Sequence, residues 1–102
     1  MKKIEEISDN IKDELKDACK YIDLALKYKE SDKTTADMYY QTSVDEMGHV
    51  ERLHKRVVDL ISEYRKTNGE PPPEMLWRYE YIHKLHMEDA TEIKVKQMMY
   101  KQ

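Results

Sequence analysis

Apolar side chains recur every three or four residues along most of the chain, which is the period of an amphipathic helix. This period predicts long helices over approximately residues 3–30, 34–67 and 74–101. No stretch alternates between apolar and polar residues for long enough to predict a strand. We therefore expect an all-α protein in which residues 1–102 form a single domain.

Two interruptions separate the predicted helices. The stronger one is the sequence Asn-Gly-Glu-Pro-Pro-Pro at residues 68–73, where the Asn-Gly pair can end a helix and the prolines prevent it from resuming. The weaker one lies at residues 31–34, where a serine, an aspartate and a threonine are all good helix N-caps. Both connections are short, so consecutive helices should lie side by side in opposite directions.

Helices of this length span about 40–50 Å, and three of them make an up-down-up helical bundle with a narrow core. The chain contains no Phe, and 8 Tyr and 7 Met supply much of the bulky apolar material. A narrow core gains buried area when the bundle pairs with a copy of itself. We therefore expect a homodimer or a larger homo-oligomer.

The charge pattern argues against two classes of partner. Lys and Arg number 18 and Asp and Glu number 21, and the two signs are interspersed, so no basic face for nucleic acid is indicated. No apolar run approaches the ~20 residues of a membrane-spanning helix, and the first residues lack the apolar segment of a signal peptide. We expect no nucleic-acid partner, no membrane partner and a cytoplasmic location. The single Cys19 is in phase with the apolar residues of the first helix and is interpreted as a core residue.

Two polar side chains interrupt the apolar stripe of the second helix. Glu46 and His49 form a Glu-x-x-His sequence and lie in phase with Val50, Leu53 and Val57. A buried carboxylate without a partner is strongly unfavourable, so Glu46 should have one. A divalent metal ion is a suitable partner, because Glu and His at this spacing can reach one ion between helices. The alternative is a simple pairing of the two side chains with each other, with an acidic neighbour or with a lysine.

Glu14 occupies the matching position on the first helix. If the first two helices form a hairpin about Asp32, facing positions have residue numbers that add up to roughly 64, because both helices rise equally per residue. Glu46 then faces residue 18 and His49 faces residue 15, so Glu14 lies within one turn of both. Phase and height together predict that Glu14, Glu46 and His49 share one metal site.

The third helix offers further candidate ligands. Around the connection at residues 68–73, Glu92 falls at the height of the first site, which makes it a candidate fourth metal ligand, although a solvated position is the favoured interpretation. On the same reckoning His86 faces His54, and His83 lies one turn beyond. These histidines form a second candidate metal cluster, with exposed or Tyr-packed rings as the alternative.

At these residues the sequence resembles the ferritin-like proteins, and among them the rubrerythrins. The resemblance lies in Glu14, in Tyr21 one heptad later, and in the segment Asp-Glu-Met-Gly-His-Val-Glu-Arg-Leu at residues 45–53. It covers approximately residues 10–65. It implies a ferritin-like fold with a di-iron site, and oxidation of ferrous iron or reduction of peroxide as the activity, so that the protein would be an oxidoreductase.

The resemblance also implies roles for the ligands. Glu46 and a partner Glu would bridge the two ions, while Glu14 and His49 would each be terminal ligands. Members of the family usually have a second hairpin that repeats these ligands, whereas this chain has only one more helix. The resemblance therefore implies that two copies of the chain each supply half of the site. Carboxylates and imidazole suit iron and manganese, and also zinc, so the ligand types alone do not choose the metal.

A second interpretation belongs to another functional class. The missing fourth helix is equally consistent with a non-enzymatic helical interaction or scaffold module that has kept the fold without a working metal site. Metal content after purification without a chelator distinguishes the two interpretations.

Overall fold

The computed structural model describes residues 2–102 and contains three α-helices. They are α1 (Lys2–Tyr28), α2 (Lys33–Asn68) and α3 (Pro73–Lys101). No strand occurs within residues 2–102, so the all-α prediction is confirmed, and each predicted helix bound lies within two residues of the observed one. None of these helices combines the length and apolarity that spanning a bilayer would require.

The helix ends follow from the residues that the sequence places there. Asp32 is the N-cap of α2, and its Oδ1 accepts a hydrogen bond from the backbone N–H of Thr35 at 3.2 Å. Gly69 ends α2 with a φ of 77°, a region that favours glycine, and donates its N–H to the Arg65 carbonyl at 3.1 Å. Pro73 is the first residue of α3, a position where its missing N–H leaves no helical hydrogen bond unmade.

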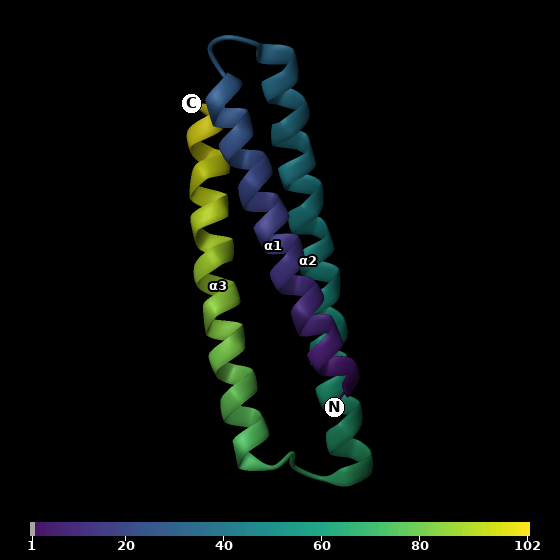
Figure 1. The fold of residues 1–102 in the computed structure, drawn as a ribbon. Helices are drawn as coiled ribbons and strands as arrows, with labels where there is room; N and C mark the ends of the chain where they lie inside the picture. The colour runs from purple at the N-terminus through teal and green to yellow at the C-terminus, as the bar shows by residue number, and fades with distance from the viewer. Residues whose placement is uncertain (1) are drawn as a thin grey trace.

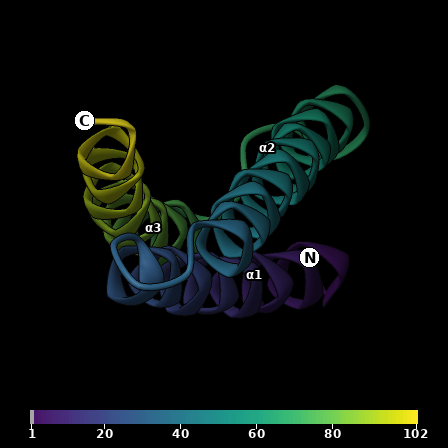
Figure 2. The ribbon, with the colours of Figure 1, turned by 90° about the horizontal axis from the view of Figure 1, so that it is seen from above.

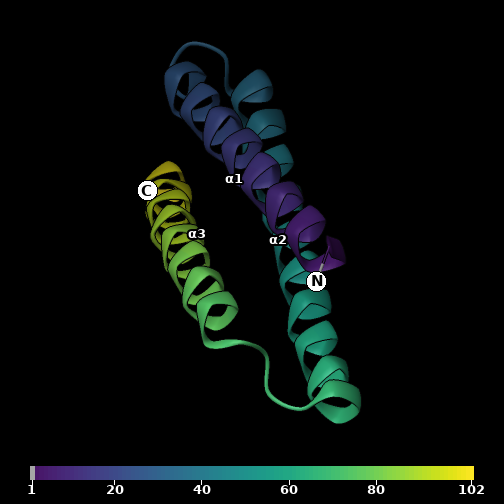
Figure 3. The same ribbon diagram turned by 60° about the horizontal axis from the view of Figure 1, so that its bottom comes forward.

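The central helix is α1, which packs against both other helices, whereas α2 and α3 touch each other in few places. Consecutive helices run in opposite directions, as Figure 1 shows. Seen from above, α2 and α3 lie on the same side of α1 and lean away from each other (Figure 2). The connection at residues 69–72 joins α2 to α3 at one end of the molecule (Figure 3), which is elongated and measures 55 × 18 × 18 Å. The α1–α2 hairpin therefore has one side covered by α3 and one side uncovered.

The apolar core runs along α1 in two clusters. The largest fully buried apolar side chains are Ile22, Val57 and Ile93, one from each helix. Ile93 belongs to the cluster around Val57, and Ile22 belongs to the second cluster, next to the α1–α2 turn. Each helix is therefore fixed to the others by at least one side chain that is removed from water, at about 1.5–3 kcal/mol for each such residue.

Ser43 is a buried polar residue that connects all three helices. Its hydroxyl donates a hydrogen bond to the Ala18 carbonyl of α1 at 2.8 Å. The same hydroxyl oxygen accepts a hydrogen bond from Nε2 of Gln97 on α3 at 3.0 Å. Both bonds lie where water does not reach Ser43, which has no exposed surface.

We expect Ser43→Ala to lower the free energy of unfolding by about 1–3 kcal/mol, because the substitution leaves the amide of Gln97 without its partner inside the protein. Urea denaturation followed by circular dichroism measures this loss. Ser62→Ala is the matched control on the exposed side of α2 and should change stability by no more than about 0.5 kcal/mol. Equal stabilities for the two variants would contradict the connecting role of Ser43.

Unlike α1, α3 carries apolar side chains on every side. Ile93 faces α1 and is buried. Large apolar side chains of α3 that remain exposed are Trp77, Tyr81, Leu85, Met87, Val95, Met98 and Met99. Exposed apolar side chains gathered on one helix often mark a surface that contacts another protein, so the outer surface of α3 is a candidate contact surface.

Candidate metal centre

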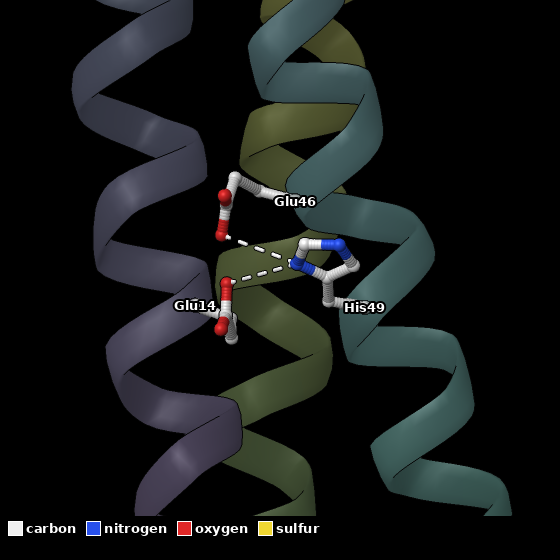
Figure 4. Close-up of side chains that lie close together, drawn as sticks. All are labelled: Glu14, Glu46 and His49. Atoms are coloured by element: carbon white, nitrogen blue, oxygen red, sulfur yellow. Dashed lines mark hydrogen bonds and ion pairs between the residues drawn. The ribbon is translucent and has the colours of Figure 1, made fainter.

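The structure brings together the three residues that the sequence assigns to the first site. Glu14 comes from α1, Glu46 and His49 come from α2, and all three side chains point into the space between these helices (Figure 4). Nδ1 of His49 lies 3.5 Å from Oε2 of Glu14 and 3.7 Å from Oε2 of Glu46. One ligand atom from each residue falls within 4.8 Å of the other two.

Helix geometry explains why these side chains meet. Glu46 and His49 are three residues apart on α2, so their side chains lie one above the other on the same face. The turn at Asp32 folds α2 back along α1, and the paired residues Glu14 and His49 then fall at the same height. The sequence prediction of phase and height is confirmed for this group, which includes no residue that the sequence pattern had not indicated.

The carboxylate of Glu46 lacks a hydrogen-bond partner. Its Oε2 atom has no access to solvent and accepts no hydrogen bond within residues 2–102. The distance of 3.7 Å to His49 is longer than a hydrogen bond, and the 3.5 Å contact between His49 and Glu14 is at the limit. A buried carboxylate oxygen left in this state costs on the order of 1–3 kcal/mol or more, so a cation between the three side chains would remove a real penalty.

The donor set fits a divalent transition-metal ion. Two carboxylates supply oxygen ligands and negative charge, and an imidazole supplies a nitrogen ligand. The three side chains are half-buried, so an ion would meet little competition from bulk water while still having a route in. Within residues 2–102 this is the one group of three or more His, Cys, Asp or Glu residues whose ligand atoms lie so close together.

Glu92 does not join this group, although it was predicted as a fourth ligand. Its Oε1 lies 3.5 Å from Nζ of Lys96, and its side chain is 63% exposed. Lys96 in turn reaches Oδ1 of Asp23 on α1 at 2.9 Å. Asp23 is nine residues beyond Glu14, about two and a half helical turns, so the two side chains point in opposite directions from α1. The height of Glu92 suits the site, but α3 lies behind the α1–α2 hairpin, on the face opposite to the one where the three side chains meet (Figure 4).

The first site therefore opens on the side of the α1–α2 hairpin that α3 leaves uncovered. Polar contacts of α3 with α1 include Asp23 and Glu5, and those with α2 include Ser43 and Asp37. None of these residues belongs to the site. Within residues 2–102 no other His, Cys, Asp or Glu side chain joins these three, so we expect solvent or another molecule to supply further ligands for an ion.

The three remaining histidines lie between α2 and α3, away from the first site. The rings of His54 and His83 stack with their centroids 4.8 Å apart and their planes 17° apart. His83 therefore faces His54, in the place predicted for His86, and His86 lies one turn further along α3. The observed pairing of α2 with α3 is therefore shifted by about one helical turn from the predicted one.

Burial lowers the pKa of both His54 and His86 below the ordinary value of about 6.5. Proximity to His83 lowers the pKa of each ring further, and His86 also feels Lys12, whereas Asp89 acts in the opposite direction. Because the folded chain binds these protons less readily than the unfolded chain, this contribution to stability is complete above the ordinary pKa. This contribution to stability is lost as the pH falls from the ordinary pKa through the lowered pKa values that His54 and His86 have in the folded chain.

We therefore expect the urea concentration at the unfolding midpoint of the chelator-treated chain to decrease as the pH is lowered below the ordinary histidine pKa of about 6.5. A His54→Gln, His86→Gln double variant should lose much of this dependence, because neither ring remains to be protonated. The same pH dependence in the double variant would show that other groups cause it.

Comparisons of the chain with protein-family models, with curated proteins and with solved structures found no match.

Proposed function

We propose that this chain is a metal-binding helical protein whose ion is held by Glu14, Glu46 and His49. The observation that carries the proposal is Oε2 of Glu46, a carboxylate oxygen without solvent access and without a hydrogen-bond partner, next to a second carboxylate and an imidazole. Three donors of this kind, from two helices, are typical of metal centres in helical bundles.

Iron is the metal that we propose, in a di-iron centre of the ferritin-like kind. The support is the set of ligand types and the Glu and Glu-x-x-His positions on neighbouring helices, which suit iron and also manganese or zinc. When bound, iron would supply redox chemistry, and the activity that fits is oxidation of ferrous iron or reduction of peroxide. The residues of the chain bind the ion and, through α1 and α2, keep the ligands close together before it arrives.

A second copy of the chain would complete this centre. One chain offers three ligand side chains, and the site opens on the uncovered side of the α1–α2 hairpin. Two hairpins facing each other there would place two such groups together and would give the four-helix core that one chain lacks. The proposed assembly is thus a homodimer with one ion for each chain.

The test is a titration of the metal-free protein with Fe²⁺ under exclusion of oxygen, combined with the mass of the particle in solution. The proposal predicts a dimer that binds about two ions, one for each chain. A monomer that binds two ions would contradict the shared centre while leaving the metal function intact. A protein that binds no Fe²⁺, Mn²⁺ or Zn²⁺ at Glu14, Glu46 and His49 would contradict the metal function itself.

The exposed apolar surface of α3 favours a second candidate function. Trp77, Tyr81 and Met98 are each more than half exposed, which is typical of surfaces that contact other proteins. A helical interaction or scaffold module without metal chemistry would also retain the three helices and this surface. Metal binding lost in a Glu46→Gln variant would argue against this candidate.

A further inference from the structure

His54, His83 and His86 are three of the four histidines in the chain, and the fold gathers them from two helices. His54 comes from α2, and its ring stacks on that of His83 from α3 at 4.8 Å. His86 follows His83 by one helical turn on the same face of α3, and both other rings are close enough to it to act on its pKa. None of them contributes to the Glu14, Glu46 and His49 group.

The ring nitrogens of these histidines are available to a ligand. Within residues 2–102 no protein group forms a hydrogen bond with them, and Glu46 supplies the only buried side-chain atom that lacks a partner. The three rings are half-buried, so their nitrogens still meet solvent. Burial favours the uncharged imidazole of His54 and of His86, which is the form that coordinates metal ions.

We propose that His54, His83 and His86 form a second metal site, separate from the first, that takes a borderline divalent cation such as Zn²⁺ and thereby links α2 to α3. Three imidazoles without a carboxylate suit Zn²⁺, Ni²⁺ and Cu²⁺ better than the hard ions Mg²⁺ or Ca²⁺. The fourth position on the ion would be filled by water.

The rings have to turn to form this site. Stacked rings do not aim their nitrogens at one point, and the three rings are not yet arranged around a common centre. Rotation about the side-chain torsions would disturb little, since all three rings are only half-buried and α2 and α3 have few other contacts. A bound ion would therefore link α2 and α3, two helices that lean apart (Figure 2).

Two charged neighbours give the proposal a specific signature. The ammonium group of Lys12 on α1 acts on His86 as a positive charge, and the carboxylate of Asp89 on α3 acts as a negative one. A bound cation would be repelled by Lys12 and attracted by Asp89, as a proton on His86 is. Lys12→Gln should therefore strengthen cation binding at the histidines, and Asp89→Asn should weaken it.

The experiment uses the full chain with Glu14→Gln, Glu46→Gln and His49→Gln, in which the first site cannot bind metal. Titration with Zn²⁺, followed by calorimetry, should show one ion for each chain, and replacing any one of the three histidines by Gln should weaken this binding at least about tenfold. Zn²⁺ should also raise the melting temperature of this triply substituted chain, which is the parent in this experiment, and not that of the variants that additionally lack one of the three histidines. Lys84→Gln, at an exposed neighbouring position on α3, is the matched control and should bind as the parent does.

Circular dichroism of each variant without metal shows whether it is folded, and conservative replacements of half-buried rings should leave the helices intact. Zn²⁺ binding that depends on His83 and His86 but not on His54 would overturn the link between α2 and α3. Binding that survives all three replacements, or no binding by the parent, would overturn the site. Because the first site is removed throughout, these outcomes do not depend on whether the proposed iron function is correct.

Discussion

Glu46→Gln is expected to weaken Fe²⁺ binding by about 100-fold or more, which corresponds to about 2.7 kcal/mol of binding free energy. Glu46 is the least exposed of the three ligands, at 18%, and supplies the oxygen that has no other partner. The amide that replaces it has almost the same shape but no charge. Anaerobic titration of the metal-free protein with Fe²⁺ measures the loss.

Glu51→Gln provides the matched control, because Glu51 is an exposed glutamate on the same helix and the substitution is chemically identical. Its Fe²⁺ affinity should equal that of the unsubstituted chain. The metal-free Glu46→Gln protein should be at least as stable as the unsubstituted one, since an uncharged amide is less unfavourable than a carboxylate in this position. Equal Fe²⁺ affinities for the two glutamine variants would show that the ion is bound elsewhere.

The second large effect concerns the attachment of α3. Ile93→Ala is expected to lower the free energy of unfolding by about 2–5 kcal/mol, because it leaves a cavity at a fully buried position. Ile93 is 1% exposed and is one of only two buried side chains of α3, the other being Tyr100. Since α3 contacts α2 in few places, its position depends largely on this contact with α1. Urea denaturation at neutral pH measures the effect.

Val95→Ala on the same helix is the control for Ile93→Ala. Val95 is 50% exposed, so its truncation should change the stability of an isolated chain by no more than about 0.5 kcal/mol. A large loss of stability for Val95→Ala and a small one for Ile93→Ala would mean that α3 packs through its other side. A loss for Val95→Ala that appears only at high protein concentration would point to an assembly that covers the outer surface of α3.

The helices could be predicted from the sequence because local rules decide them. The apolar period of α1, the N-cap at Asp32 and the glycine at Gly69 all act within a few residues of the element that they define. The hairpin of α1 and α2 could be predicted for a related reason. A short turn fixes which residues face each other, and a distinct apolar stripe on each helix fixes their rotation.

The first site was predictable for the same reason. Glu14, Glu46 and His49 interrupt the apolar stripes of α1 and α2 at heights that match across the Asp32 turn, so phase and spacing were sufficient. Both quantities belong to one hairpin and need no knowledge of the third helix.

The position of α3 could not be predicted in this way. Its apolar residues lie on every side, so the sequence pattern contains no preferred face, and the chain could have been closed on either side of the hairpin. Ile93 is buried while Val95 and Met98 are exposed, a distinction that only the packing against α1 reveals. The prediction for Glu92 depended on this choice, and the structure places Glu92 next to Lys96, on the face of the α1–α2 hairpin opposite to the site.

The measurement that tests the central claim most directly is the metal content of the protein after purification without a chelator, determined by plasma emission together with that of Glu46→Gln. The proposed function predicts iron or manganese at about one ion for each chain, and its loss in the variant. A protein that carries neither metal and takes up no Fe²⁺ in the absence of oxygen would contradict it, and would leave Glu14, Glu46 and His49 as a structural group between α1 and α2.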